Sequence, residues 1–376
     1  MEYKPLGSMV NRKIGYGIVQ PGQSVPDGVP VIKVNNLISG LKSPSELDTT
    51  ARENEAKYSR TRLHGGELIV SVVGTIGKTA IVPKSFAGCN LVRATALIDI
   101  EDELMSKWVK YYFDSPCGQS YIEQNLNTTV QPTLNIKSLV EMPIPIRDTT
   151  EMEKTVLLLS ALDEKIEVNR QINDNLEQQA MALFKSYFVD FKSTGGIVPD
   201  SWKEYRLGDF LPVITGKKNA NVSSSIGKYP FFSCSQDIAW TNDYSFDGSA
   251  ILVAGNGDFN VKFYDGKFEA YQRTYVLIPQ KARYTAWLYY AVKYNLDKIT
   301  ISARGSVIKF ITKGNLENFA FWAPSDLDSE LIIEYFAEIN KNIAANRSEN
   351  ARLSELRDVL LPKLMSGEID VSAVQL

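Results

Sequence analysis

Two stretches, 159-LSALDEKIEVNRQINDNLEQQAMAL-183 and 336-FAEINKNIAANRSENARLSELRDVL-360, decide the architecture that we expect for this chain. In both, seam residues recur at alternating steps of three and four, which is the heptad spacing of a coiled coil. The first seam contains Leu159, Leu162, Ile166, Asn169, Asn173, Leu176, Ala180 and Leu183, and the second contains Phe336, Ile339, Ile343, Asn346, Asn350, Leu353, Arg357 and Leu360. The asparagines occupy the same steps in both seams. A polar seam residue fixes register, because only a partner at its own level satisfies it, so the two helices are predicted to pair with each other.

The segments that precede the two helices also correspond to each other in order. Each half begins with a short motif that ends in glycine, at 3–7 and at 205–208. The next correspondences are extended segments at 30–36 and 230–236, glycine-punctuated apolar strands at 68–74 and 251–255, Arg93 and Arg273 each five residues before an isoleucine, tryptophan-led helices at 108–112 and 287–290, small polar stretches at 128–131 and 305–308, and proline-terminated strands at 142–143 and 322–324. This shared order indicates an internal duplication.

The duplication predicts an α+β fold in which two pseudo-two-fold related mixed α/β domains are separated by two long antiparallel coiled-coil helices. The expected boundaries are 1–150 for the first domain, 151–191 for the first helix, 192–326 for the second domain, 327–367 for the second helix and 368–376 for a C-terminal tail. At 1.5 Å per residue, a seam of about 30 residues spans roughly 45 Å. The alternative is that each helix packs only on its own domain; the coincident asparagines favour pairing.

Bulk composition restricts the class of protein. Hydrophobic residues make up 44% and charged residues 23% of the 376 residues, as in globular proteins. Neither a signal peptide nor an apolar run of roughly 20 residues is visible, so we expect a cytoplasmic protein. Cys89, Cys117 and Cys234 are too scattered for a disulfide framework or a CxxC site. The net charge of −3 argues against DNA binding, unless basic residues cluster on one face or a partner contacts the phosphates.

Motifs of catalysis are missing from the sequence. The segment 74-GTIGKT-79 resembles a phosphate-binding loop, but Val72 stands where that loop needs its first glycine, so a tight turn is the better interpretation. The short segment 255-GNG-257 is likewise interpreted as a turn. No Asn/Asp-Pro-Pro-Tyr/Phe tetrapeptide of an adenine methyltransferase is present, and His64 is the single histidine. We therefore expect no active site, no metal and no cofactor.

A duplicated arrangement of domain and helix resembles the specificity subunits of type I restriction-modification enzymes. The resemblance covers nearly the whole chain and is most specific at the helix ends, 183-LFKSYFVDF-191 and 360-LLPKLMSGEI-369. Two further segments, 74-GTIGK-78 and 129-TVQPTL-134, are also similar to recurrent family segments, whereas 255-GNGD-258 departs from the pattern by lacking the lysine.

The resemblance implies a non-catalytic subunit with two target-recognition domains, each of which reads half of an interrupted site in double-stranded DNA. It also implies assembly with two methyltransferase subunits, which methylate adenine, and with two motor-nuclease subunits for cleavage. Partners that surround the DNA would supply phosphate contacts, while this chain contributes the base contacts that carry sequence information. Such a division would account for the acidic balance of the chain.

We call the predicted domains reader one (1–150) and reader two (192–326), and expect their loops to face the major groove. There each base pair shows its own pattern of donors and acceptors, which amides, hydroxyls, arginine and lysine can match. The candidates in reader one are Lys33, Asn35, Asn36, Thr75, Lys78, Asn90, Arg93, Thr128 and Gln131. The candidates in reader two are Ser235, Gln236, Asn256, Lys262, Gln272, Arg273, Arg304, Ser306 and Lys309. The aromatic residues at helical spacing are interpreted as core: Trp108, Tyr111, Tyr112, Trp287, Tyr289 and Tyr290.

The alternative function is a protein-interaction scaffold that docks through its coiled coil and does not contact DNA. Gene context separates the two hypotheses, since a neighbouring adenine methyltransferase gene supports DNA reading.

Overall fold

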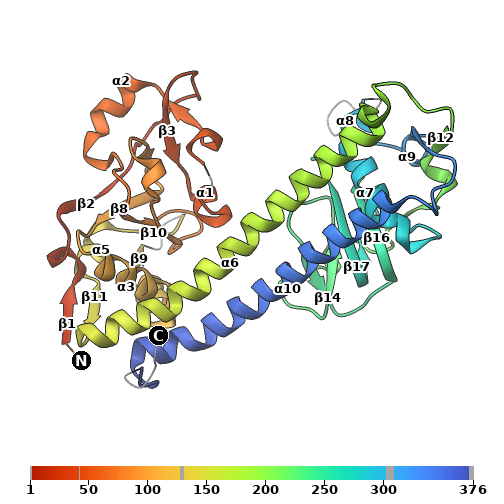
Figure 1. Ribbon diagram of the computed structural model, residues 1–376. Helices are drawn as coiled ribbons and strands as arrows, with labels where there is room; N and C mark the ends of the chain where they lie inside the picture. The colour runs from red at the N-terminus through yellow and green to blue at the C-terminus, as the bar shows by residue number, and fades with distance from the viewer. Residues whose placement is uncertain (1, 42, 128–130, 302–308, 372–376) are drawn as a thin grey trace. The chain divides into compact units, whose positions relative to one another are not determined.

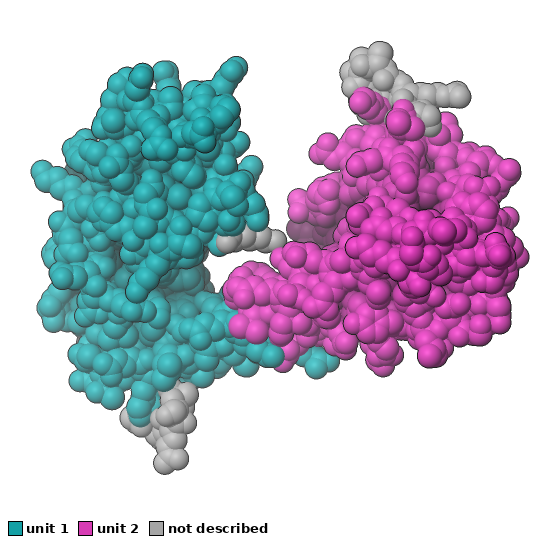
Figure 2. Space-filling view, turned by 45° about the horizontal axis from the view of Figure 1, so that its top comes forward, with its two compact units in different colours: residues 1–166, 351–376 teal, residues 167–350 magenta. Residues whose placement is uncertain are grey.

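The computed structural model describes residues 2–41, 43–127, 131–301 and 309–371. The chain forms two compact units, shown in different colours in Figure 2: unit 1 contains residues 1–166 and 351–376, and unit 2 contains residues 167–350. Two long helices, α6 (Thr149–Phe184) and α10 (Leu331–Ser366), each contribute to both units (Figure 1). None of the described helices combines the length and the apolar character that a membrane span needs.

Unit 1 is built on a small antiparallel sheet with further short strand pairs around it. The sheet has the order β2 (Arg12–Tyr16), β8 (Thr95–Asp99), β5 (Leu68–Ser71), β6 (Thr79–Ile81). Beside it, β3 (Val29–Ile32) pairs with β4 (Thr49–Thr50) and, in parallel, with β7 (Asn90–Leu91). The other pairs are β1 (Glu2–Pro5) with β11 (Pro143–Ile146) and β9 (Leu126–Asn127) with β10 (Thr133–Leu134). The helices are α1 (Val34–Ser39), α2 (Arg52–Glu55), α3 (Glu103–Asp114), α4 (Pro116–Gln124) and α5 (Ile136–Glu141).

Unit 2 contains a larger sheet that combines the equivalents of these strands. Its order is β13 (Val213–Thr215), β18 (Thr274–Leu277), β16 (Phe246–Ala254), β17 (Val261–Ala270), β14 (Tyr229–Phe232), β15 (Ala239–Thr241). A separate pair joins β12 (Trp202–Arg206) to β19 (Ala320–Pro324). The shorter helices are α7 (Thr285–Tyr294), α8 (Leu296–Thr300) and α9 (Lys313–Glu317). The predicted α+β duplication, with a long helix after each set of strands, is confirmed.

Strand register shows which residues of the two units are equivalent. Leu68 pairs with Ile98 in unit 1, as Ile251 pairs with Leu277 in unit 2. Counting back along β8 and β18 from these pairs makes Arg93 equivalent to Gln272. Arg273 is therefore equivalent to Ala94, and the correspondence of Arg93 with Arg273 that the sequence suggested is wrong by one residue. Alignment on the next isoleucine gave the wrong register, because Ile98 in β8 is structurally equivalent to Leu277 in β18 and not to Ile278.

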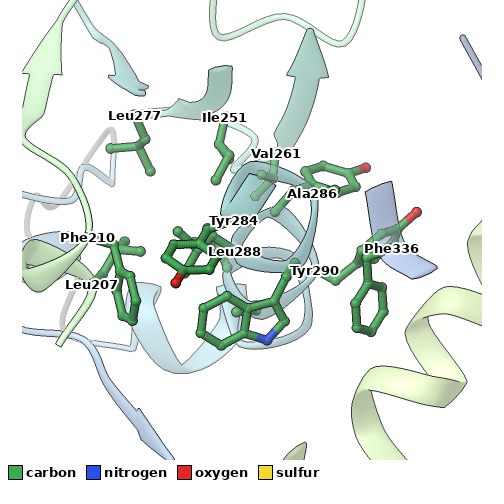
Figure 3. Packing of buried hydrophobic residues seen from close by; sticks show 14 of the residues in the cluster. Leu207, Phe210, Ile251, Val261, Leu277, Tyr284, Ala286, Leu288, Tyr290 and Phe336 are labelled. Atoms are coloured by element: carbon green, nitrogen blue, oxygen red, sulfur yellow. The ribbon is translucent and has the colours of Figure 1, made fainter. Parts of the chain in front are cut away.

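The tryptophan-led helices α3 and α7 lie in the cores of their units. Trp108 and Trp287 are both fully buried, and the tyrosines that follow them are no more than 6% exposed. In unit 2, α7 packs against the sheet on one side and against Phe336 of α10 on the other (Figure 3). The prediction that these aromatic residues form core, and not base-stacking surfaces, is confirmed.

The end of α10 requires a glycine. Gly367 has a φ of +77°, and its amide donates to the carbonyl of Leu364 at 3.2 Å. A Cβ at this position would lie 2.1 Å from the guanidinium of Arg147, in the segment between β11 and α6. The predicted C-terminal signature therefore closes the helix against unit 1 through the smallest residue available.

Candidate nucleic-acid interface

A tight turn between β7 and β8 presents the exposed Arg93 and the half-buried Ala94 of unit 1 on a hydrogen-bonded backbone. The Val92 amide donates to the carbonyl of Ile32 at 3.1 Å, and the Arg93 amide to that of Ile18 at 2.8 Å. The Thr95 amide closes the turn on the carbonyl of Val92 at 2.9 Å. We call residues 92–95, and their equivalents 271–274 in unit 2, the framed turns.

The framed turn of unit 2 repeats these bonds one for one. The amide of Tyr271 donates to the carbonyl of Phe232 at 2.9 Å, that of Gln272 to Lys218 at 2.9 Å, and that of Thr274 to Tyr271 at 2.8 Å. A further bond ties each turn to its central strand, since Val72 and Gly255 donate to the residues that precede the two threonines. The backbone is therefore the same in both units, while the outward side chains differ.

A second turn in unit 1 carries Thr75 and Lys78, which are both exposed. The Ser71 hydroxyl donates to the carbonyl of Thr75 at 2.6 Å and accepts from the Lys78 amide at 2.8 Å. Gly77 supplies a positive φ of +81°, and a Cβ there would meet the Gln119 amide at 2.9 Å. The segment that resembles a phosphate-binding loop thus makes a tight turn between β5 and β6.

The corresponding turn in unit 2 borders a hollow of about 390 Å³. Three of the predicted DNA-binding residues, Asn256, Gln272 and Arg273, line it, and Tyr275 and Phe310 provide aromatic walls. Its described lining contains no carboxylate. By contrast, the hollow of about 700 Å³ in unit 1 is lined by Glu67, Asp99, Glu101 and Glu103 besides two lysines. The smaller hollow is therefore the better match for a polyanion.

Two other candidates in reader two support a loop beside β17. Lys262 is half-buried and donates to the carbonyl of Ser235 at 2.6 Å and to Asn260 Oδ1. Burial lowers the pKa of the Lys262 ammonium. The Ser235 hydroxyl accepts from the Asp237 amide at 3.2 Å, and Gln236 between them is exposed. Lys262 therefore holds this loop in place instead of projecting into solvent.

The start of α1 gathers three candidates of reader one. Lys33 forms an exposed ion pair with Asp48 at 2.6 Å. The Asn36 side chain accepts from the Lys33 amide at 2.7 Å, and the carbonyl of Asn35 accepts from Ser39 at 3.0 Å. The bond between Asn36 and the Lys33 amide caps the start of the helix, and the other two contacts engage Lys33 and the Asn35 backbone locally.

The prediction that Asn90 binds DNA is wrong, because its side chain is buried and cannot reach DNA. It is fully buried in β7, where its amide donates to Glu55 at 3.0 Å and to the carbonyl of Tyr58 at 3.1 Å. Its oxygen accepts from Thr61 at 2.8 Å. A saturated buried amide stabilises the fold, so Asn90 is not part of the interface that we propose below.

The remaining candidates flank parts of the chain that the structure does not describe. Gln131 and Lys309 are exposed, and the carbonyl of Lys309 accepts from Gly257 at 3.2 Å. Thr128, Arg304 and Ser306 lie outside the described residues.

The seam asparagines of α6 and α10 bond to one another inside unit 2. Asn169 Nδ2 donates to Asn350 Oδ1 at 2.9 Å, and Asn346 Nδ2 donates to Asn173 Oδ1 at 2.9 Å. A higher residue number in α6 is paired with a lower one in α10, so the two helices run antiparallel here. The other seam residues of both helices are all buried or half-buried: Leu159, Leu162, Ile166, Leu176, Ala180, Leu183, Phe336, Ile339, Ile343, Leu353, Arg357 and Leu360.

Comparison with known proteins shows which family has this duplicated arrangement. The family model described as "Type I restriction modification DNA specificity domain" matches residues 2–178 and again residues 199–355. The chain belongs to this specificity family. Each match covers one reader together with most of the long helix that follows it, as the sequence resemblance implied.

Individual relatives match different shares of the chain. It is 38% identical over 183 residues to the type I restriction enzyme EcoDI specificity subunit of Escherichia coli, a match of 47% of this chain and 40% of that relative. It is 23% identical over 307 residues to the MjaIX specificity subunit of Methanocaldococcus jannaschii, covering 72% and 71%. The crystal structure of a type I restriction-modification S subunit from M. genitalium has the same fold, with a TM-score of 0.55 at 16% identity over 96% of this chain and 95% of that one.

Sequence reasoning missed the charged groups that attach α6 to the rest of unit 1 and of unit 2. In unit 1, Asp163 of α6 accepts from Tyr111 at 3.0 Å and pairs with Lys110 at 3.2 Å, and Arg357 of α10 adds a bond at 2.9 Å. Burial opposes ionisation of Asp163, but Lys110 and Arg357 hold the pKa of its carboxyl below the ordinary value.

Unit 2 has a comparable attachment. Glu177 of α6 accepts from Tyr289 at 2.7 Å and pairs with Lys293 of α7. Burial again opposes ionisation, and the bonds from Lys293 and Tyr289 keep the pKa of Glu177 below its ordinary value. Glu177 is far in sequence from Tyr289 and Lys293, so no local sequence pattern could predict these contacts.

Proposed function

We propose that this chain is the DNA-specificity subunit of a type I restriction-modification enzyme and reads an interrupted, bipartite site with one reader on each half. The observation that carries the proposal is the repeated framed turn, in which one backbone arrangement displays different polar side chains in the two units. A reader must keep its scaffold while the bases that it recognises change. The comparisons support this function, since the matching family is one of DNA specificity. They offer no support for a scaffold without DNA contact.

Partner subunits supply the chemistry in this proposal. The chain would bind double-stranded DNA together with two methyltransferase subunits, and two motor-nuclease subunits would join for cleavage. Apolar side chains exposed on the long helices suit protein docking: Leu157, Val168 and Ile172 on α6, and Leu331, Tyr335, Leu356 and Val359 on α10. With a net charge of −3, the chain would also depend on its partners for much of the phosphate contact. Because its DNA substrate lies there, we place its action in the cytoplasm.

Mapping of methylated adenines tests the function directly. Cells with the chain and its methyltransferase partner should show one interrupted motif, and the motif should vanish when the gene for this chain is removed. The purified chain alone should neither methylate DNA, cleave it nor hydrolyse ATP. A methylation pattern that does not depend on this gene would overturn the assignment. Methylation, DNA cleavage or ATP hydrolysis that persists in the repurified chain alone would also overturn it.

A further inference from the structure

The framed turns combine equivalent backbone hydrogen bonds in the two units with different exposed side chains. Thr95 and Thr274, which end the turns, are both buried, and the amides of the turns bond at equivalent positions. The exposed positions of the turns hold different residues, Arg93 in unit 1 and the pair Gln272 and Arg273 in unit 2. The bonded backbone fixes where each side chain leaves the turn, so the differing side chains of the two units start from equivalent, defined positions.

These outward side chains have no partner among the described residues. Arg93, Gln272 and Arg273 make no side-chain hydrogen bond or ion pair within the part of the chain that the structure describes. Other arginines are engaged, for example Arg62 with Glu55 at 2.5 Å and Arg283 with Glu334 at 3.1 Å. An unpaired guanidinium on a rigid turn keeps its donors available for a ligand.

The hollow of unit 2 indicates the kind of ligand. Arg273 and Gln272 border it next to Asn256, and its described lining offers donors and aromatic surface without a carboxylate. The hollow has a volume of about 390 Å³. Among the base edges of the major groove, guanine presents two acceptors, O6 and N7, that match the paired donors of arginine.

We propose that the framed turn is a base-specifying element of each reader, and that Arg273 in reader two and Arg93 in reader one each recognise a guanine of their half-site. The inference rests on the proposed function and assigns specificity within it. Gln272 stands next to Arg273 and suits an adenine in the neighbouring base pair, because its amide matches N6 and N7.

Reciprocal substitutions test the assignment. The whole chain, with its methyltransferase partner, is expressed against a plasmid library randomised over the motif, and methylated adenines are mapped. Arg273→Ala should relax a guanine in the second half-site, with discrimination falling about 5- to 150-fold, and should leave the first half-site intact. Arg93→Ala should do the reverse. Arg273→Gln should replace the preference for guanine by one for adenine.

Controls separate this inference from the proposed function. Arg206→Ala removes an exposed arginine of the same unit whose side chain bonds Asn318 at 3.4 Å, and it should leave both half-sites unchanged. If the unaltered complex marks no bipartite motif, the proposed function fails. If it marks one and Arg273→Ala keeps every specified base, the inference alone fails. For a variant that no longer methylates, selection of bound duplexes from a randomised pool decides: loss at one guanine supports the inference, and equal weakening at all positions overturns it.

Discussion

At the scale of single residues, the seam asparagines carry the internal symmetry in their hydrogen bonds. Asn169 and Asn346 occupy equivalent positions and both donate; Asn173 and Asn350 are equivalent and both accept. Each bond is therefore the image of the other under the duplication. Glu349, which accepts the second hydrogen of Asn169 at 2.7 Å, lies off the seam. Such a bond fixes register because a shifted helix would bury an unpaired amide.

Removal of one of these donors should loosen the helix pair. Asn346→Ala leaves the oxygen of Asn173, a residue that is 9% exposed, without its partner, and should cost about 1–3 kcal/mol. Hydrogen exchange of the amides of α10 would measure the change as faster opening. Asn342→Ala, at an exposed position of the same helix, is the matched control and should change the opening free energy by less than about 0.5 kcal/mol. Equal effects of both variants would contradict a special role for the seam.

Acid should weaken the attachment of α6 in unit 1. The pKa of Asp163 is below its ordinary value in the folded protein, because Lys110 and Arg357 oppose the effect of burial. The stabilisation is therefore complete above the unfolded value of about 3.9 and is lost as the pH falls through the folded pKa. Asp163→Asn should lower the melting temperature at neutral pH and flatten its fall in acid. Glu164→Gln, at the exposed neighbour, should keep the pH profile of the unaltered chain, and an unchanged profile in Asp163→Asn would refute the linkage.

The candidate interface could be predicted from sequence only in part, for reasons that are visible residue by residue. Gln272 and Arg273 stood out as polar residues at a turn, and the structure places both at the hollow. Asn90 looked the same in sequence, but the parallel pairing of β3 with β7 buries it. A strand of two residues has no periodicity that reveals which side faces inward. Whether a polar residue serves the fold or a ligand thus depended on pairing between distant segments.

At the scale of elements, the long helices were predictable and the sheets were not. The seam spacing predicted helices at 151–191 and 327–367, where the structure has α6 over Thr149–Phe184, followed by a π-helical turn, and α10 over Leu331–Ser366. Sheet order depends on contacts such as that of β3 with β7, which no local pattern encodes. One long β17 also replaces the separate β6 and β7 of the other unit, so similar sequences of motifs gave sheets of different size.

Helix length should determine the gap between half-sites. Adding seven residues to α6 between Asp163 and Asn169, and seven to α10 between Asn350 and Arg357, keeps both sets of contacts in register. Each helix becomes longer by about 10 Å, which corresponds to roughly three base pairs of DNA. Mapping of methylated adenines should then show the same specified bases with a gap longer by about three. Four residues added to α6 alone should weaken the asparagine pairs, and an unchanged gap in an active double insertion would refute the dependence on length.

At the scale of the whole molecule, the duplication predicts that the first half can pair with a second copy of itself. In a fragment that ends near Phe191, Asn173 of one copy would take the place of Asn350 and accept from Asn169 of the other. Phe184 and Phe188 would replace the equivalent Leu361 and Met365 in the core of unit 1. Ala180 would replace Arg357, so Asp163 would keep Lys110 and lose its second cation.

With the methyltransferase partner, two such fragments should mark a palindrome made from the first half-site and its inverted copy, since closed two-fold symmetry follows from a self-complementary surface. Light scattering would establish the dimer, and sequencing of methylated sites would establish the motif. A Gly367→Ala variant of the whole chain is a useful comparison, because it strains the end of α10 and leaves the fragment's own residues untouched. A fragment that stays monomeric, or that marks the original asymmetric motif, would show that the halves are not interchangeable.

The division of the chain into a continuous unit 2 and a discontinuous unit 1 also sets an order in time. During synthesis, residues 167–350 are all available before residues 351–366 of α10 emerge. Until then Leu159, Val156 and Met152 of α6 lack the leucines and the methionine of α10 that belong to the same finished core. The unit that is encoded first is thus completed last. A nascent chain stalled before α10 ends would expose the hydrophobic surface of α6 to chaperones and proteases.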